Sequence, residues 1–451
     1  MPPGRWKGKP NRETPTAYLE QSPFQQQLLA RMIIETVCSK HFADQYLRAF
    51  INQTGTRQLC DVCQESRKCA DVAAIAQRIE QDLRREYEPL WQSDLPYNPD
   101  EDRFPFGPPI DTNELIESET SIDPYEIIEA ICKEIETKEW ARQDWILPQS
   151  DYMRYGWQSF SRIVKHRMRF VFFSEKNHRL FSDIDSDSLH PQEVLKEVGK
   201  LIKWLKITHE YPPGSLNLVR ARQHMRNEAP KNADSLGAPP DKYAQANRMS
   251  PAGISMFYGA FDKETCLAEI VDYDWKASSV TYGSFTNRVA LRLIDFSMAF
   301  KFPSLFNPGY NGNANYLREG IVFLNAFVQD LRKPISKKDV HIEYVPTQIV
   351  CEYLRYMYAG GQIDGLIYES AKHRGGRCVV LFVDNKESID EGVPAGDIAR
   401  RVTAPKLVLQ AKSVTRVSFK RLWALHLAAE ARALAEIDKQ LSSFLPYPAA
   451  E

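Results

Sequence analysis

The sequence predicts an α+β protein, with a mostly helical N-terminal domain followed by a mixed α/β domain. Three observations indicate this fold class. Apolar residues recur at helical spacing through residues 22–208. A sharp break, YPPGS, follows at 211–215, and beyond it the apolar runs are short and rich in β-branched residues. Helical patterns alternate with those runs, which is typical of a sheet packed against helices. We therefore expect a domain boundary near 195–212.

The length, charge and hydropathy of the chain limit the number of domains and the classes of protein to which it can belong. It has 451 residues and a formal net charge of -1. The length predicts two or three domains, and the near-zero charge does not favour bulk nucleic-acid binding, although local basic patches stay open. No apolar run approaches the roughly 18 to 20 residues that cross a bilayer. Residues 1–20 are basic and Pro-rich and lack the apolar core of a secretory signal, so we expect a loose tail and a cytoplasmic protein.

The N-terminal domain is expected to span 21–200 and to consist of amphipathic helices. In the clearest of them, Val72, Ile75, Ile79 and Leu83 recur at helical spacing. A loop rich in Pro and Asp is expected at 92–112. The expected helices lie at 22–56, 70–90, 125–140, 157–173 and 192–208.

Four residues at 38–63 have the spacing of a metal site. Cys38-x2-His41 is followed, after a spacer, by Cys60-x2-Cys63. Two such pairs supply four ligands for tetrahedral zinc, and four protein ligands leave no open position for catalysis. We therefore expect structural Zn²⁺, with Cys69 close enough to substitute for one ligand. The alternative is a set of unrelated thiols beside a surface histidine.

The C-terminal half alternates short strands with helices. Helices are expected at 262–272, 315–332 and 346–359. A last helix, rich in Ala and Leu, is expected at 421–445; its apolar stripe would pack on its own domain or make a homo-oligomer contact. The expected strands are NLVRA, SMFYG, VALRLI, GLIYES, CVVLFV and the run PKLVLQAKSVTRVSF at 405–419.

The stretch RMSPAGISMFYGAFDKETCLAEI places several polar groups in one turn–strand–helix unit. Arg248 precedes a turn, and Tyr258 lies on the short strand that follows. Asp262 is a plausible helix N-cap. Glu269 falls at the edge of the apolar face of that helix, where a half-buried acid needs a partner. It is either paired with Arg248 or exposed to a cleft.

Two further segments favour a ligand site. Arg220 and Arg222 alternate with apolar residues in a strand and would share one face, an arrangement that suits a diphosphate. Ser370 ends the strand GLIYE, before a loop that contains Lys, His and Gly. The plainer interpretations are solvated arginines at a sheet edge and a hairpin loop.

Together these segments resemble the RES domain, over roughly 212–420. The resemblance is carried by LVRAR, the ordered R…FYGAF…CLAEI block, PTQIVCEYLR and DGLIYES…GGRCVVLF. It implies a fold like that of ADP-ribosyltransferases, degradation of NAD⁺, and a toxin or defence role with an antitoxin or regulatory protein as partner. The N-terminal half is similar to the HEPN-type helical domain, opened by a zinc-like cysteine cluster, that precedes some RES domains.

The resemblance also implies roles for single residues in breaking the bond between nicotinamide and ribose. Glu269 would stabilise the sugar cation, Tyr258 would stack on nicotinamide or ribose, and Ser370 would bind the ribose or amide. Arg248 and either Arg220 or Arg222 would hold the pyrophosphate. The acceptor of the ribosyl group stays open among water, phosphate and protein.

Other functions remain as alternatives. HEPN domains can be ribonucleases that use an Arg and a His on one helix, and Arg162 and His166 share a helix face at i, i+4. The basic and aromatic residues of 157–173 would also suit RNA or an acidic partner. A third alternative is a non-enzymatic interaction module, in which the N-terminal half is a docking or inhibitory surface.

Overall fold

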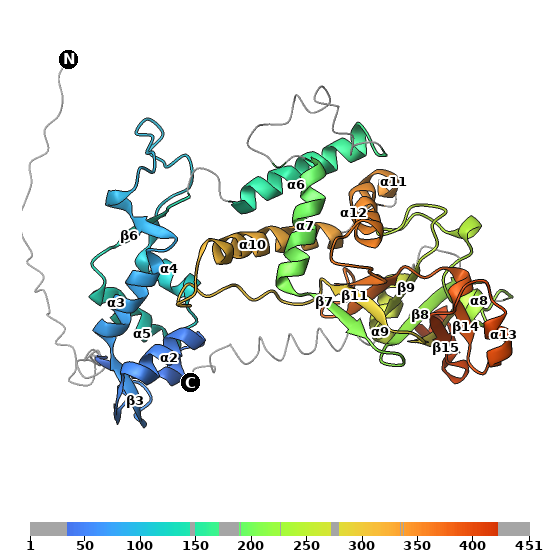
Figure 1. The fold of residues 1–451 in the computed structure, drawn as a ribbon, viewed down its shortest axis with the longest axis horizontal. Coiled ribbons are helices and arrows are strands. Elements are labelled where there is room, and N and C mark those ends of the chain that lie inside the picture. The colour runs from blue at the N-terminus through green and yellow to red at the C-terminus, as the bar shows by residue number, and fades with distance from the viewer. Residues whose placement is uncertain are drawn as a thin grey trace, which may run out of the picture. The chain divides into compact units, whose positions relative to one another are not determined.

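The computed structural model describes residues 34–144, 149–170, 189, 191–225, 227–271, 279–333, 335–336 and 338–422. The described residues form two compact units, one within 1–145 together with 304–309, and the other within 146–303 and 310–451 (Figure 1). Each unit is described by itself. The expected α+β class is confirmed, because the first unit is mainly helical and the second is built on a mixed sheet. No described helix is long and apolar enough to span a membrane.

The first unit combines helices with two small antiparallel sheets, β1-β3-β2 and β4-β6-β5. Helices α3 and α5 pack together, and Ile75, Ile79 and Ile131 are fully buried, as their helical spacing predicts. The strands are β1 Thr36–Cys38, β2 Thr56–Leu59, β3 Ser66–Asp71, β4 Tyr87–Pro89, β5 Ile110–Asp111 and β6 Glu139–Arg142. The helices are α2 Gln45–Thr54, α3 Val72–Leu83, α4 Thr112–Glu119 and α5 Tyr125–Glu134, with 3₁₀ turns η1 Ser39–His41 and η2 Leu90–Gln92.

The helix expected at 22–56 is only partly correct. Residues up to 33 lie outside the described part, 36–38 form strand β1, and helix α2 begins only at Gln45. The side chain of Asp44 accepts the amides of Tyr46 and Leu47, which fixes that start. The β-branched Thr36 and Val37 suit a strand, and β1 pairs with β3.

A buried carboxylate ties the segment 304–309 into the first unit. Asp82 is 2% exposed and pairs with Arg78 at 2.6 Å and with Arg85 at 2.9 Å. The same arginines donate to backbone carbonyls of the segment, Arg78 to Phe306 at 3.1 Å and Arg85 to Asn307 at 2.7 Å. A buried acid is tolerated only when it is paired, so these contacts hold helix and segment together.

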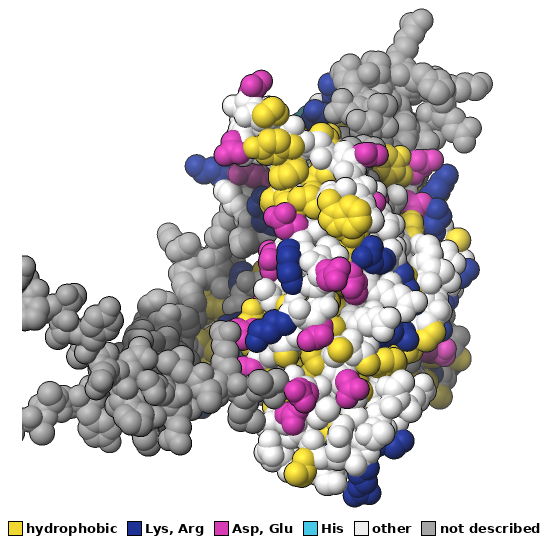
Figure 2. Space-filling model, turned by 90° about the vertical axis from the view of Figure 1, so that its left-hand side faces the viewer, with side chains coloured by type: hydrophobic (Ala, Val, Ile, Leu, Met, Phe, Trp, Pro, Cys, Tyr) yellow, Lys and Arg dark blue, Asp and Glu magenta, His cyan; other side chains and the backbone are white. Residues whose placement is uncertain are grey.

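The surface view is turned so that the left-hand side of Figure 1 faces the viewer. Acidic and basic side chains are interspersed over this face, and hydrophobic side chains gather in its upper part (Figure 2). The loop between β4 and β5 exposes large apolar side chains, among them Trp91 and Phe106. Neither sign of charge dominates the described residues of the face shown.

The second unit is organised around a ten-stranded sheet in the order β14-β15-β10-β8-β9-β13-β12-β11-β7, with β16 also paired to β10. Most pairs are antiparallel, and β11/β12 and β14/β15 are parallel. The strands are β7 Thr208–Tyr211, β8 Asn217–His224, β9 Phe257–Ala260, β10 Ser279–Asn287, β11 Leu291–Asp295, β12 Gly365–Glu369, β13 Arg377–Leu381, β14 Ser388–Asp390, β15 Leu407–Leu409 and β16 Thr415–Ser418.

Helices of the second unit cover the sheet (Figure 1). The largest core cluster joins α6, α7, α10 and α12 to one face of β12 and β13, with Leu366 and Val380 at its base. The other face carries a second cluster around Phe257 and Val379. The helices are α6 Gln149–His166, α7 Pro191–Leu205, α8 Ala233–Leu236, α9 Lys263–Ile270, α10 Gly312–Arg332, α11 Val340–Glu343, α12 Val345–Tyr356 and α13 Ala395–Ala399, with 3₁₀ turns η4 Asp241–Tyr243, η5 Asn385–Glu387 and η6 Ala411–Ser413.

The division between the units differs from the boundary expected at 195–212. It falls near 145, because α6 and α7 bury their apolar faces against the sheet and the other helices of the second unit. Phe160 of α6 and Leu201 of α7 are fully buried in the same cluster as Ile294 of β11. Helix α6 also ends at His166, before the expected residue 173. The helix expected at 421–445 lies outside the described residues beyond Leu422.

Candidate active site and metal centre

The acid and the serine singled out in the sequence meet in space. Ser370 directly follows β12, and its hydroxyl donates to Glu269 Oε1 of α9 at 2.5 Å. The same oxygen accepts the backbone amides of Lys372 at 3.1 Å and His373 at 2.9 Å. Ser370 is 3% exposed. Because its hydroxyl has one donor and two acceptor positions, these three contacts fix its orientation toward the carboxylate.

Helix α9 and the loop 371–376 are tied to one another. Asp262 caps α9, since its side chain accepts the amide of Thr265 at 2.7 Å as expected for an N-cap. The hydroxyl of Thr265 lies 2.7 Å from Nδ1 of His373 in the loop. Gly376 ends the loop, and a Cβ there would lie 2.2 Å from that hydroxyl. The absence of a side chain at Gly376 thus permits the close approach that brings Ser370 to Glu269.

Two tyrosines line the sheet face next to this pair. Tyr258 of β9 is opposite Val380 of β13, and Tyr368 of β12 is opposite Cys378 of the same strand. Because Cys378 and Val380 are two residues apart, the two tyrosine side chains share a face. The hydroxyl of Tyr258 lies 3.0 Å from that of Ser250, and burial raises the pKa of Tyr258. Burial, with the nearby Cys378, Tyr258 and Glu269, raises the pKa of Tyr368 well above its usual value. Both phenols therefore stay neutral.

Arg248 belongs to the same neighbourhood. Its positive charge opposes the rise in the pKa of Tyr368, so the two groups are within electrostatic reach. The guanidinium donates to the carbonyl of Lys333 at 2.9 Å and lies over the ring of Tyr344 at 5.5 Å. Its Nη1 is buried and has no hydrogen-bond partner among the described residues. A buried donor without a partner is an exception that a bound anion would explain.

A cationic pocket adjoins Ser370. It has a volume of 410 Å³ and is lined by Gln329, Arg332, Lys333, Ser370, Ala371, Lys372 and Arg374. Arg332 pairs with Glu369 at 2.6 Å, and the ammonium of Lys372 donates to the carbonyl of Glu269 at 2.8 Å. The sequence pattern predicted no role for Arg332, Lys333, Lys372 or Arg374. Lys372 and Arg374 belong to the loop that follows Ser370, so their place in the sequence gives a signal. Arg332 and Lys333, at the end of α10, are distant in sequence from that loop, and no local pattern connects them to it.

The structure does not bring Arg220 and Arg222 to the tyrosine face. Val219 of β8 pairs with Ala260, so Val219 shares the face of Tyr258, and both arginines begin on the opposite face. Arg220 donates to the carbonyl of Leu236 at 2.9 Å and to the carbonyl of Tyr258, and it lies over the ring of Phe257 at 5.2 Å. Arg222 donates to the carbonyl of Gly237 at 2.9 Å. The two guanidinium groups therefore hold the end of α8 and the β9 backbone.

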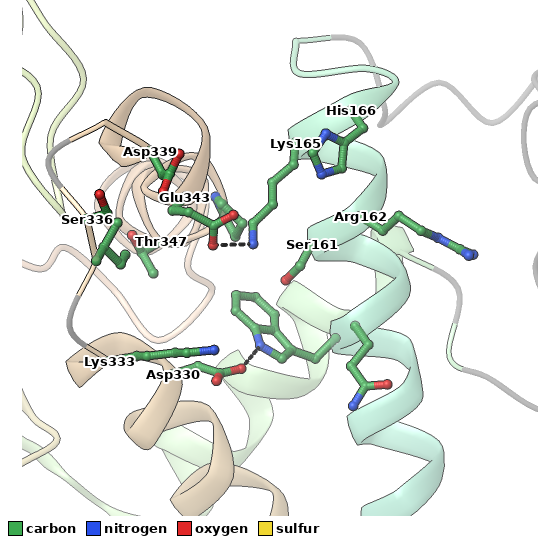
Figure 3. A pocket seen from close by; sticks show the side chains of 14 residues that line it. Ser161, Arg162, Lys165, His166, Asp330, Lys333, Ser336, Asp339, Glu343 and Thr347 are labelled. Carbon is green, nitrogen blue, oxygen red and sulfur yellow. Dashed lines mark hydrogen bonds and ion pairs between the residues drawn. The ribbon is translucent and has the colours of Figure 1, made fainter.

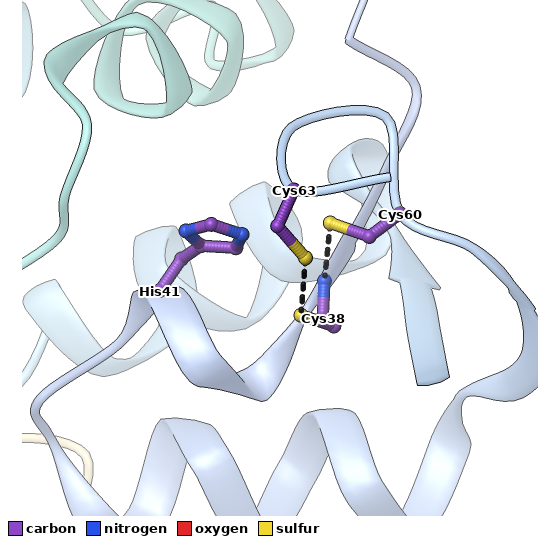
Figure 4. A group of neighbouring side chains, drawn as sticks. All are labelled: Cys38, His41, Cys60 and Cys63. Atoms are coloured by element: carbon purple, nitrogen blue, oxygen red, sulfur yellow. Dashed lines mark hydrogen bonds between the residues drawn. The ribbon is translucent and has the colours of Figure 1, made fainter. Parts of the chain in front are cut away.

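The cysteines and histidine of 38–63 converge in the first unit. The ligand atoms of Cys38, His41, Cys60 and Cys63 all lie within 4.8 Å of one another (Figure 4). Cys38 and His41 come from β1 and η1, and Cys60 and Cys63 from the turn between β2 and β3. Cys38 Sγ is 3.7 Å from Cys63 Sγ. Two ligand pairs on two tight turns are typical of a four-ligand site for zinc.

The histidine is oriented as a metal ligand would be. Its Nδ1 lies 2.9 Å from the carbonyl of Asp123, while its Nε2 is buried without a hydrogen-bond partner among the described residues. A carbonyl partner on one ring nitrogen directs the other toward a metal. Burial raises the pKa of Cys60, but the amides of Cys63, Val62 and Cys38 outweigh it and lower that pKa to about 6. These residues fit a metal ion. Cys69, the possible substitute, instead contacts the carbonyls of Gln58 and Arg67.

Arg162 and His166, the residues of the ribonuclease alternative, are both exposed on α6. They line a second pocket of the second unit, beside α10 and α11–α12. Figure 3 shows Arg162 directed away from the pocket and His166 next to Lys165. No described contact joins the two residues to each other.

Comparison with known proteins places the chain in a class. Residues 217–403 match the RES domain family, and residues 53–178 match HEPN/RES N-terminal domain 1. The chain therefore carries a RES domain preceded by a HEPN/RES N-terminal domain, as the resemblance predicted. The RES domain associates it with NAD-related enzymatic toxins in general. No curated protein and no solved structure is similar enough to the chain to be matched.

These matches bracket the two sites. All six candidate active-site residues fall within the RES match. Cys60 and Cys63 fall within the N-terminal match, and Cys38 and His41 precede it. Helix α6 also lies in the N-terminal match, although it packs in the second compact unit. The two family matches are separated at residues 179–216, whereas the two compact units divide at residue 145.

Proposed function

We propose that the RES domain binds NAD⁺ and breaks the bond between nicotinamide and ribose. The observation that carries this proposal is the contact of the Glu269 carboxylate with the Ser370 hydroxyl beside the cationic pocket. An acid next to several cations suits a substrate that develops positive charge on a sugar and carries negative charge on a diphosphate.

The carboxylate of Glu269 stabilises the oxocarbenium-like ribose as nicotinamide leaves. The Ser370 hydroxyl holds the carboxylate in position and can exchange that contact for a ribose hydroxyl. Tyr258 and Tyr368, neutral and largely buried, form an aromatic wall on which the nicotinamide or ribose packs and which excludes water. The leaving nicotinamide is neutral, so its departure needs no proton donor.

We assign the diphosphate to Arg248 and to the cations of the pocket, Arg332, Lys333, Lys372 and Arg374. This assignment replaces the one that the sequence suggested for Arg220 or Arg222, because both of those arginines begin on the sheet face opposite to Tyr258. Arg248 keeps one buried donor for an anion, and arginine favours forked contacts with phosphate oxygens.

The acceptor of the ribosyl group is water, phosphate or a protein nucleophile. Water gives ADP-ribose and a proton, and phosphate gives the 1″-phosphate of ADP-ribose; nicotinamide is released in each case. Chromatography of the products, with and without phosphate, distinguishes these outcomes. The cellular role that we propose is that of a toxin or defence effector, restrained by an antitoxin or another regulatory partner. Cys38, His41, Cys60 and Cys63 would hold Zn²⁺ as a structural ion, because four protein ligands leave no open position for catalysis.

The substitution Glu269→Gln tests the reaction. It keeps the size and most hydrogen bonding of the side chain but removes its charge. We expect nicotinamide release to fall by about 10²–10³-fold, the usual effect of losing a charge-stabilising group, with an unchanged melting temperature. Glu264→Gln is the control, because Glu264 lies exposed on the same helix. Undiminished release by the Glu269 variant would remove this carboxylate from the mechanism.

A further inference from the structure

The second pocket of the RES-containing unit lies beside the first. It has a volume of 610 Å³, within the range of about 300–1,000 Å³ that is typical of small-molecule sites. Its walls are α6, the end of α10, and the segment 335–347 that includes α11 (Figure 3). We call it the α6 pocket.

The α6 pocket and the cationic pocket share a residue. Lys333, which follows α10, lines both of them. Arg248 donates to the carbonyl of Lys333, and the backbone carbonyl of Arg248 accepts the hydroxyl of Thr347, another residue of the α6 pocket. The two pockets therefore share Lys333, and Arg248 contacts residues that line them, in the region where the proposed function puts the diphosphate.

The two pockets differ in their charge. Four cations line the pocket beside Ser370. In the α6 pocket, the ammonium of Lys165 is neutralised by Glu343 at 2.7 Å, and the carboxylate of Asp330 accepts the indole N–H of Trp157 at 2.8 Å. Arg162, Lys333 and Asp339 also line the α6 pocket, so its cations and carboxylates balance, whereas no acid is among the residues that line the cationic pocket. One pocket thus suits phosphates, and the other suits a group without net charge that makes polar contacts.

The chemistry of the α6 pocket fits a nucleoside. Trp157, which is 5% exposed, and the buried Pro346 contribute apolar edges to the pocket wall, against which a flat base can pack. The indole contact fixes the carboxylate of Asp330, which has further lone pairs to accept ribose hydroxyls. A carboxylate on the ribose diol is a common device for adenosine recognition in dinucleotide sites.

We propose that the α6 pocket binds the adenosine half of the dinucleotide, while the cationic pocket binds the diphosphate and the nicotinamide half lies at Glu269 and Ser370. This inference rests on the proposed function and names a second subsite of the same substrate. It also gives α6 a role: a helix within the HEPN/RES N-terminal match supplies one wall of the substrate site. Helix α6 would then belong to the enzyme, although it lies within the N-terminal family match.

The substitution Ser161→Trp tests the proposal by filling the pocket. Ser161 is partly buried on α6 and points into the α6 pocket (Figure 3). We expect the KM for NAD⁺ to rise about tenfold or more with little change in kcat, because ground-state and transition-state binding of adenosine are lost together. Cleavage of nicotinamide mononucleotide, which lacks adenosine, should stay at the wild-type rate. Arg154→Trp, an exposed substitution on the same helix outside the pocket, is the control.

The outcomes separate this inference from the proposed function. An unchanged KM for NAD⁺ in the Ser161 variant would overturn the subsite, and so would an equal loss of activity on both substrates. Binding of ADP, measured by calorimetry, tests the pocket without turnover. ADP should bind wild type and the Arg154 variant but bind the Ser161 variant at least about tenfold more weakly. Equal binding to all three proteins, or none to wild type, contradicts the inference, whereas loss of turnover with normal ADP binding contradicts only the reaction.

Discussion

Arg220 shows how a buried guanidinium can serve the fold rather than a ligand. It donates to carbonyls of Leu236 and Tyr258, in the region where β9 meets β8 through a single pair of residues. Burial, assisted by the nearby Arg222, lowers the pKa of Arg220 to about 9. A folded-state pKa below the ordinary value means that the buried charge costs stability at neutral pH. The two carbonyl contacts offset that cost.

The substitution Arg220→Lys should therefore destabilise the protein. Lysine keeps the charge but cannot reach two carbonyls with a planar fork, so one buried acceptor loses its partner. We expect the free energy of unfolding of the RES-containing unit, from urea denaturation, to fall by about 1–3 kcal/mol. Arg222→Lys, at a position where one carbonyl contact is described, should cost less. Equal effects of the two substitutions would show that the two hydrogen bonds from Arg220 to carbonyls do not account for its contribution to stability.

At the scale of elements, the turn between β2 and β3 and the segment β1–η1 are held together by few apolar contacts. The buried cluster there consists of Cys38, Cys60 and Cys69, with Val62 and Cys63 packed against it. Strands of three to six residues form a marginal sheet without further support. A metal ion bound by both segments would supply that support, because ligand binding to the folded state adds directly to its stability.

We expect the purified protein to contain about one zinc ion per chain, measured by native mass spectrometry. Cys60→Ser and His41→Ala should lower that content and make residues 36–71 more sensitive to proteolysis, since each removes a ligand. Cys69→Ser should keep the ion, because the Cys69 thiol contacts carbonyls and is not in the ligand group. If the Cys69 variant loses zinc as the Cys60 variant does, Cys69 is a ligand and the four-residue ligand set proposed here is wrong.

On the scale of the whole molecule, α6 and α7 decide where the RES domain begins as a folding unit. The family match begins at residue 217, after both helices. The buried cluster nevertheless includes residues from both, such as Phe160, Val164, Leu195 and Leu201. Each large apolar side chain contributes about 1.5–3 kcal/mol when it is fully buried, and domains are stable by only about 5–15 kcal/mol. Loss of the two helices would exceed that margin.

A fragment of residues 149–451 should accordingly fold, and a fragment of 207–451 should not. The first keeps α6 and α7 on the sheet, whereas the second exposes the apolar faces that they cover. Circular dichroism during heating checks the prediction: the longer fragment should unfold cooperatively, and the shorter one should be insoluble or show no transition. Cooperative unfolding of the shorter fragment would mean that the helices are dispensable for the core.

Much of the fold follows from the sequence because it depends on local patterns. The spacing of Ile75 and Ile79 predicts α3, and Asp262 predicts the start of α9. The Cys-x2-His and Cys-x2-Cys pairs predict a shared metal site, and their ligand atoms converge. The order of Arg248, Glu269 and Ser370 along the chain predicts the RES domain, which is confirmed by the family match.

The features that the sequence did not predict depend on how distant segments pack together. Alternation in LVRAR places Arg220 and Arg222 on one face, but only the register of β8 with β9 shows that this face is opposite to Tyr258. An amphipathic pattern shows that α6 buries one side, but not that the partner is the RES sheet. Lys333 and Ser370 line one pocket although their positions differ by 37 in the sequence. Local sequence patterns do not predict contacts between residues so far apart. The sequence by itself therefore determined most of the elements and the family, and it predicted candidate reactive residues, since these follow from patterns along the chain. The tertiary structure alone decided their neighbours, since contacts between distant segments depend on the register and packing of the whole sheet.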